Sequence, residues 1–223
     1  MSIWIKICGN TSLPDARLAA EAGADALGFV FAPSPRRVTA SEVAGMVALL
    51  PEKVEKIGVF VNAGLEEIYS TVRAAGLTGV QLHFDAGPEL PARLRALLGP
   101  SLRIVCVAHF ETAAAALASR TVAEYARNPH VDTVLVDSRT SAAVGGTGVA
   151  FDWAKARKTV FSQARTLKLI AAGGLTPLNV AEAVEGLRPW GIDVVSGVED
   201  APGRKDPFKV REFVARARAV DRG

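Results

Sequence analysis

The stretch Ile3-Trp4-Ile5-Lys6-Ile7-Cys8-Gly9 is an apolar run that ends in a thiol and a glycine. Such a run predicts a buried strand, and the glycine after it predicts a tight turn. Ligands of parallel α/β proteins bind at the carboxyl ends of the strands. Cys8 therefore lies where a fold of this kind would place a functional side chain.

Seven similar runs follow along the chain. Strands are predicted at residues 3–8, 26–30, 56–61, 79–83, 103–107, 133–137, 168–172 and 192–196. Their almost continuous apolar character is typical of strands that are covered on both faces, as in a parallel sheet. The stretches between them have the period of helices with one buried face, and this is clear over residues 43–50, 65–72, 180–187 and 213–220.

Eight strand–helix units in 223 residues match the size of a closed (β/α)8 barrel, the TIM barrel. An open doubly wound sheet has the same local pattern, but no GxGxxG motif lies near the first strand, and the barrel is therefore favoured. No linker or low-complexity tract interrupts the alternation. We expect a single α/β barrel domain over residues 1–223.

The bulk composition excludes several classes of function. Hydrophobic residues make up 49% of the chain, charged residues 22%, and the net charge is only +3. No basic stretch is interleaved with aromatic residues, which argues against nucleic acid as a partner, whereas a small anionic substrate fits the mild positive charge. No segment stays apolar for about 18 residues, so we expect neither a membrane span nor a signal peptide.

Cys8 and Cys106 are the only cysteines, and they lie far apart in the sequence. This usage provides no disulfide framework and no zinc spacing, and it is typical of a cytoplasmic protein. Cys106 lies in mid-strand between Val105 and Val107, and we expect it to belong to the core.

Asp137 closes the run Thr133-Val134-Leu135-Val136-Asp137 and is the natural partner for Cys8. A thiolate and a carboxyl at two strand ends would form a general base and a general acid. Lys6 would lower the pKa of the thiol if both side chains lie on one face of the strand. In the alternative interpretation, Cys8 is a core residue and Asp137 caps a turn or pairs with Arg139.

The glycine-bearing stretch from Ser141 to Gly148 follows Asp137 and has the composition of a lid. A carboxyl beneath a lid would have a raised pKa and could act as an acid.

A phosphate site is predicted after the last two strands. Ala172-Gly173-Gly174-Leu175 follows the seventh strand and Val195-Ser196-Gly197-Val198 follows the eighth. Glycines let backbone N–H groups approach an anion closely, and these two loops are the usual phosphate seat of a TIM barrel. The alternative is that the glycines only make tight turns.

Two further side chains are candidates for binding a substrate. Arg36 follows Ser34-Pro35, and a stiffened loop there would present a planar donor to a carboxylate. His83 ends the fourth strand and would either bind substrate or fill a structural role. His109 and His130 have no evident partner, and no metal-binding motif occurs, so neither a metal nor a cofactor is expected.

Taken together, the motifs resemble those of the phosphoribosylanthranilate isomerase family over nearly the whole chain. The matching segments are Lys6-Ile7-Cys8-Gly9, Gly28-Phe29-Val30-Phe31 with Ser34-Pro35-Arg36-Arg37-Val38, Val59-Phe60-Val61-Asn62, Val80-Gln81-Leu82-His83, Asp137-Ser138, Gly145-Gly146-Thr147-Gly148 with Phe151-Asp152-Trp153, Ala172-Gly173-Gly174-Leu175 with Asn179-Val180, and Ser196-Gly197-Val198-Glu199 with Lys205-Asp206. Each segment alone is weak evidence for the family, but the order and spacing of the segments make the whole set specific to it.

The resemblance implies a cofactor-free barrel that carries out an Amadori rearrangement in tryptophan biosynthesis. The sequence leaves open whether the chain is a monomer or a homodimer. It implies that Asp137 is the general acid and Cys8 the general base. It further implies that Arg36 holds the anthranilate carboxylate, and that Gly174, Ser196 and Gly197 belong to the loops that bind the phosphate.

Three positions depart from the family pattern: Phe84 replaces a glycine, Val195 replaces a serine, and the loop before Arg36 is one residue short. Two other functions are consistent with some of the same residues. The related isomerase of histidine biosynthesis uses two aspartates, which Cys8 argues against. A barrel that only binds phosphorylated ligands would need the phosphate loops but not an acid and a base.

Overall fold

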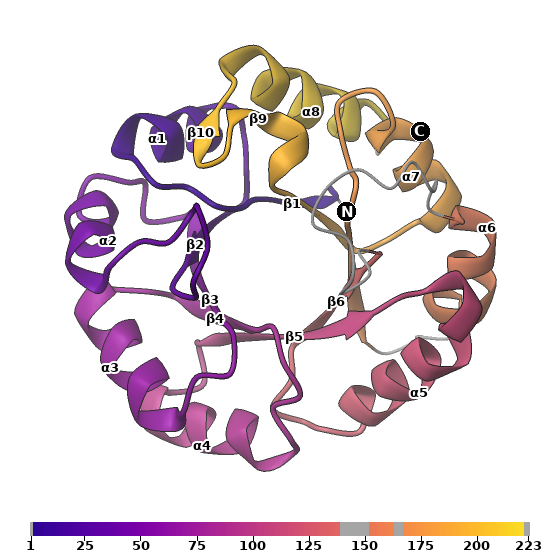
Figure 1. Cartoon of the computed structure of the whole chain (residues 1–223), viewed down its shortest axis with the longest axis horizontal. Helices are drawn as coiled ribbons and strands as arrows, with labels where there is room; N and C mark the ends of the chain where they lie inside the picture. The colour runs from indigo at the N-terminus through magenta and orange to yellow at the C-terminus, as the bar shows by residue number, and fades with distance from the viewer. Residues whose placement is uncertain (1, 139–151, 163–166, 221–223) are drawn as a thin grey trace.

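The computed structural model describes residues 2–138, 152–162 and 167–220. Eight parallel strands pair in sequence order and close into a barrel, in which β8 returns to β1. Figure 1 looks down this ring, with the helices arranged around it. The strands are β1 (Trp4–Ile7), β2 (Ala26–Val30), β3 (Glu55–Phe60), β4 (Gly79–Leu82), β5 (Arg103–His109), β6 (Thr133–Asp137), β7 (Lys168–Ala172) and β8 (Gly191–Val194). The predicted TIM barrel is confirmed.

Eight α-helices cover the outside of the barrel in the described part of the chain. They are α1 (Leu13–Glu21), α2 (Ala40–Val47), α3 (Leu65–Ala75), α4 (Glu89–Leu98), α5 (Ala115–Ala126), α6 (Trp153–Ala156), α7 (Val180–Leu187) and α8 (Pro207–Val220). Side-chain caps fix some of their starts: Thr39 and Glu42 form a capping box at α2. The expected helical face of α7 is confirmed, because its four periodic apolar residues are all buried.

Successive side chains of each strand point alternately out of and into the barrel, and they form two separate cores. Ile5 and Ile7 point outward into the large core between strands and helices, which also contains Cys106. Trp4 points inward and belongs to a smaller cluster inside the barrel. Lys6 and Cys8 share its parity and therefore face the interior of the barrel as well. Cys106 is a core residue, as predicted.

Aromatic side chains close the amino-terminal end of the barrel. Trp4 and Trp190 stack with ring centroids 5.2 Å apart. The Arg103 guanidinium lies 5.8 and 5.4 Å from these two rings and is paired with Glu55. Burial and cation–π contact of this kind stabilise the fold, and they leave the opposite end of the barrel for a ligand.

The strand boundaries differ from prediction where the chain enters the mouth of the barrel. β8 stops at Val194 rather than at residue 196, because Ser196 begins a short 3-10 helix, η3 (Ser196–Val198). The segment after it forms a two-stranded hairpin that is not predicted from the sequence, β9 (Glu199–Ala201) with β10 (Arg204–Lys205). β5 runs two residues further than predicted and ends at His109.

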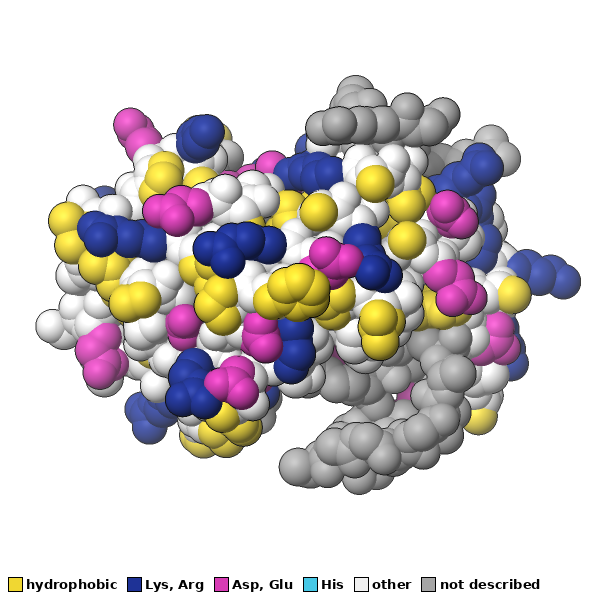
Figure 2. All heavy atoms as spheres, turned by 90° about the horizontal axis from the view of Figure 1, so that it is seen from above, with side chains coloured by type: hydrophobic (Ala, Val, Ile, Leu, Met, Phe, Trp, Pro, Cys, Tyr) yellow, Lys and Arg dark blue, Asp and Glu magenta, His cyan; other side chains and the backbone are white. Residues whose placement is uncertain are grey.

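Surface charge agrees with the mild net charge. On the face shown in Figure 2, basic, acidic and apolar side chains are interspersed and form no continuous basic field. Among the described helices, none is long and apolar enough to span a membrane.

Candidate active site

Cys8 directly follows β1 and is 3% exposed. Its backbone N–H donates to the carbonyl of Val194 at 2.9 Å, which continues the pairing of β1 with β8. Burial raises the pKa of the thiol above its ordinary value, although the neighbouring Lys6 ammonium acts in the opposite direction. The expectation that Lys6 yields a cysteine of lowered pKa is therefore wrong, because desolvation outweighs the charge.

Lys6 lies beneath Cys8 inside the barrel and is fully buried. Its Nζ is 2.9 Å from Oδ1 of Asp193 on β8, and Lys6 and Cys8 lie close enough to shift each other's pKa. Burial would lower the pKa of Lys6, but the charges of Asp193 and Cys8 raise it overall. Lys6 therefore stays protonated and provides a fixed positive charge under the thiol.

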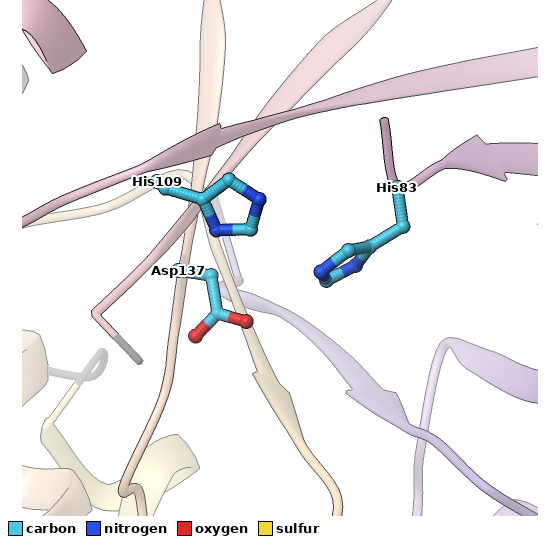
Figure 3. Close-up of side chains that lie close together, drawn as sticks. All are labelled: His83, His109 and Asp137. Carbon is cyan, nitrogen blue, oxygen red and sulfur yellow. The ribbon is translucent and has the colours of Figure 1, made fainter. Parts of the chain in front are cut away.

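Asp137 ends β6, is 2% exposed, and faces the mouth of the barrel beside two histidines. His109 is its register partner on β5, and His83 directly follows β4. Figure 3 shows the three side chains grouped around one space. Their potential ligand atoms all lie within 4.8 Å of one another, and the two imidazole rings meet edge to face at 5.2 Å.

This cluster combines two nitrogen donors and one carboxylate, which is a donor set that suits a divalent transition metal. The same three groups can also hold and transfer protons. The sequence contains no metal motif because the three residues lie at or just after the ends of three separate strands, and only the fold brings them together.

The two predicted phosphate loops lie together at the carboxyl ends of β7 and β8. They line a small pocket formed by residues 172–175 and 193–197. Gly174 has a φ of +64°, which favours glycine, and a methyl group on Gly197 would come within 1.8 Å of the Leu175 carbonyl oxygen. Such bare backbone allows an anion to approach N–H groups closely. The structure thus brings Gly174, Ser196 and Gly197 into one pocket.

Arg36 and Arg37 take different directions in the loop after β2. Arg37 is exposed, whereas Arg36 turns toward the β8 side of the mouth. Arg36 donates from Nε to Glu199 Oε1 at 2.8 Å and from Nη2 to Oε2 at 2.6 Å. Of these two neighbours, Arg36 is therefore the one that reaches the candidate site.

Three charged residues near Cys8 belong to the site although no role was predicted for them from the sequence: Asp193, Glu199 and Lys205. Lys205 Nζ donates to the Cys8 carbonyl at 2.5 Å and lies 3.1 Å from Glu199 Oε1. Lys205 and Cys8 are 197 positions apart in the sequence, so no local pattern pointed to this contact. The only available signal was the recurrence of Glu199 and Lys205 in the matched segments.

Two expectations fall outside the described residues. The proposed lid from Ser141 to Gly148 and the alternative partner of Asp137, Arg139, both lie within residues 139–151.

Comparison with known proteins agrees with this geometry. Residues 5–216 match the family model for N-(5'-phosphoribosyl)anthranilate (PRA) isomerase. The chain belongs to this family. The isomerase from Geobacter metallireducens is 41% identical over 219 residues, which cover 97% of this chain and all of the relative, and that from Magnetococcus marinus is 43% identical over 225 residues, which cover 100% and 99%.

Solved structures of isomerases support the same assignment. That of phosphoribosyl anthranilate isomerase from Thermotoga maritima has a TM-score of 0.85 at 31% identity, with 97% of this chain and 99% of that chain covered. Another isomerase, in complex with reduced 1-(o-carboxyphenylamino)-1-deoxyribulose 5-phosphate, has a TM-score of 0.81 at 30% identity, with 97% and 99% covered. This chain is an N-(5'-phosphoribosyl)anthranilate isomerase of tryptophan biosynthesis.

Proposed function

We propose that Cys8 and Asp137 are the general base and the general acid of this isomerisation, on the single barrel formed by residues 1–223. Asp137 gives its proton to the furanose ring oxygen, and the bond from that oxygen to C1 breaks to leave a Schiff base. Cys8 removes the proton from C2, and the resulting enolamine tautomerises to the ketone. Proton transfers to and from positioned side chains supply typically 10²- to 10⁴-fold in rate.

The observation that supports this proposal is the shared location of the acid, the base and the phosphate pocket. Cys8 directly follows β1, Asp137 ends β6, and the pocket lies after β7 and β8. All three are at the carboxyl edge of one barrel, where TIM-barrel enzymes carry their active sites. A phosphate held at residues 172–175 and 193–197 would hold the ribose chain at this edge.

The charges around Cys8 support its role as a base despite burial. The thiol is flanked by the cations of Lys6 and Lys205, both of which lower its pKa, while burial raises it more strongly. When the pKa of a thiol is raised, only a minority of the molecules carry the thiolate near neutral pH, but that thiolate is a stronger proton acceptor. The proposal therefore predicts a rate that rises as the thiol ionises.

Arg36 is proposed to bind the anthranilate carboxylate. Nε and one N–H of Nη2 donate to Glu199, and within the described residues the other N–H groups of the guanidinium have no partner, so they can form a second fork toward a substrate. We further propose that His83 contacts the substrate at the mouth, beside Asp137.

The experiment that tests the proposed function follows the loss of fluorescence of freshly prepared phosphoribosylanthranilate. Turnover by the purified protein is expected without added metal or cofactor. No turnover at micromolar enzyme would overturn the proposal, and binding of a phosphorylated product analogue without turnover would indicate a barrel that only binds. We propose a cytoplasmic monomer or homodimer, and gel filtration distinguishes the two.

A further inference from the structure

Three charged side chains form one connected network at the edge of the site: Arg36, Glu199 and Lys205. Glu199 accepts two hydrogen bonds from the Arg36 guanidinium and lies 3.1 Å from the Lys205 ammonium. The Glu199 side chain is 4% exposed and that of Lys205 is fully buried, while the Arg36 side chain is 19% exposed. Arg36 is thus the member of the network that reaches solvent.

The β9–β10 hairpin brings this network together. Lys205 donates from Nζ to the carbonyl of Cys8 at 2.5 Å and approaches that of Val195 at 3.5 Å. Glu199 Oε1 also accepts from the backbone N–H of Gly203 at 3.3 Å. One buried lysine therefore connects the backbone beside the proposed base to the carboxylate that holds Arg36.

The net charge of the network suits an anionic partner. Burial lowers the pKa of Lys205, and the charge of Glu199 acts against that shift. With Lys205 protonated, two cations and one anion leave one positive charge in surplus, and the exposed part of that charge is on Arg36. Burial would raise the pKa of Glu199, but the hydrogen bonds from Arg36 and the charge of Lys205 lower it overall. Glu199 therefore stays ionised, and both of its carboxylate oxygens accept hydrogen bonds from Arg36.

Buried ion pairs rarely repay their cost of desolvation as stability alone, and hydrophobic replacements are often no less stable. A network of this kind is better explained by the geometry that it imposes. With Nε and Nη2 held by Glu199, the guanidinium plane has one orientation, and its remaining N–H groups point in a fixed direction.

We propose that Glu199 is a positioning residue that orients Arg36 for the substrate carboxylate, and that Lys205 fixes Glu199 in turn. This inference rests on the proposed role of Arg36. Neither Glu199 nor Lys205 needs to touch the substrate.

The test compares two substrates, one made with anthranilate and one made with aniline, which lacks the carboxylate. We expect Glu199→Gln to lower kcat/KM for the anthranilate substrate by about 10- to 100-fold, the range for a charged hydrogen bond. The aniline substrate should lose less than about threefold. Asp200→Asn is the matched control, since Asp200 is the next residue on β9 and its pair with Arg204 is exposed; it should affect neither substrate.

A double-mutant cycle shows whether Glu199 acts through Arg36. If it does, Glu199→Gln should have almost no further effect once Arg36 is replaced by Met. Glu199→Asp keeps the charge and should recover part of the discrimination, and it also serves if Glu199→Gln fails to fold. Equal losses on both substrates, or additive effects of the two replacements, would overturn the inference.

The inference and the proposed function fail in different ways. If wild type handles both substrates equally, Arg36 does not bind the carboxylate, and the proposed role of Arg36 is wrong. If wild type discriminates between them and Glu199→Gln discriminates equally well, only the positioning role is wrong.

Discussion

The thiol of Cys8 packs directly against the backbone of Gly28 on β2, so closely that a methyl group there would lie 2.4 Å from Sγ. The same methyl group would lie 2.9 Å from Cys8 Cβ and 3.0 Å from its Cα. A contact with the Cα cannot be relieved by rotating the side chain. The bare backbone of Gly28 is therefore part of what sets the position of the proposed base.

Gly28→Ala is expected to lower kcat by at least tenfold, because the Cys8 sulfur must move, and small displacements at a reacting group cost large factors in rate. Overpacking of this kind also costs about 1–3 kcal/mol of stability. Steady-state kinetics and thermal unfolding measure the two effects. Gly45→Ala on α2 is the control, since a methyl group there meets nothing within 4 Å; it should leave kcat unchanged and stabilise the helix slightly. Full activity of Gly28→Ala would show that the position of Cys8 is not critical.

Cys8→Ala should lose about 10²- to 10⁴-fold in kcat while it stays folded and still binds a phosphorylated product analogue. Cys106→Ala is the matched control, because Cys106 is equally buried but faces the outer core. Burial raises the pKa of Cys106 to about 12, so it stays a neutral thiol, and its replacement should affect stability rather than rate. Near wild-type turnover by Cys8→Ala would show that Cys8 is only a core residue.

The barrel could be predicted from the sequence because its signals are local. Apolar runs such as Thr133–Asp137 mark strands, and the period of residues 180–187 marks a buried helix face; each needs no knowledge of distant residues. The ends of strands also placed Cys8 and Asp137 at the mouth. The residues next to Cys8 and Asp137 in the sequence were sufficient to predict this position.

The parts that could not be predicted depend on contacts between distant segments. His109 joins His83 and Asp137 only because β4, β5 and β6 lie side by side. Glu199 meets Arg36 across 163 residues. The direction of the Cys8 pKa was predicted wrongly because the charge of Lys6 can be read from the sequence, whereas the degree of burial that outweighs it cannot.

Asp137→Asn should remove most of the turnover, because an amide keeps the shape of the carboxyl but cannot deliver a proton to the ring oxygen. Wild type needs a thiolate together with a protonated carboxyl, which gives a bell-shaped profile of kcat/KM against pH. In the variant the limb that the carboxyl contributes is lost, and the limb of the Cys8 thiol remains. Its residual kcat/KM should rise with pH and level off above about 8.5, the ordinary pKa of a cysteine, since burial raises the pKa of Cys8. A profile identical to that of wild type would contradict the assignment of the acid.

Arg36→Met should remove roughly 1.5–3 kcal/mol of the free energy with which the enzyme binds the substrate carboxylate, the range for charged hydrogen bonds. The loss falls on KM if the contact is equal in the ground state and the transition state, and on kcat if it orients the ring. Arg37→Met is the control, because Arg37 is exposed next to it in the same loop. If Arg37→Met lowers kcat/KM and Arg36→Met does not, Arg37 is the residue that binds the carboxylate.

Zinc ions should inhibit the enzyme by occupying the space between His83, His109 and Asp137. Their ligand atoms lie within 4.8 Å of one another, and small rotations would bring them to the bonds of about 2.0–2.2 Å that zinc makes with nitrogen and oxygen. A cation there would bind the proposed acid and stop it from donating a proton, so inhibition should be reversed by a chelator. His109→Gln removes one ligand and should raise the inhibitory zinc concentration by at least tenfold, whereas His130→Gln, which changes the histidine outside the cluster, should not. Equal inhibition of wild type and His109→Gln would show that zinc binds elsewhere. The Cys8 thiol is then the first alternative site, and a direct zinc-binding assay on Cys8→Ala tests it.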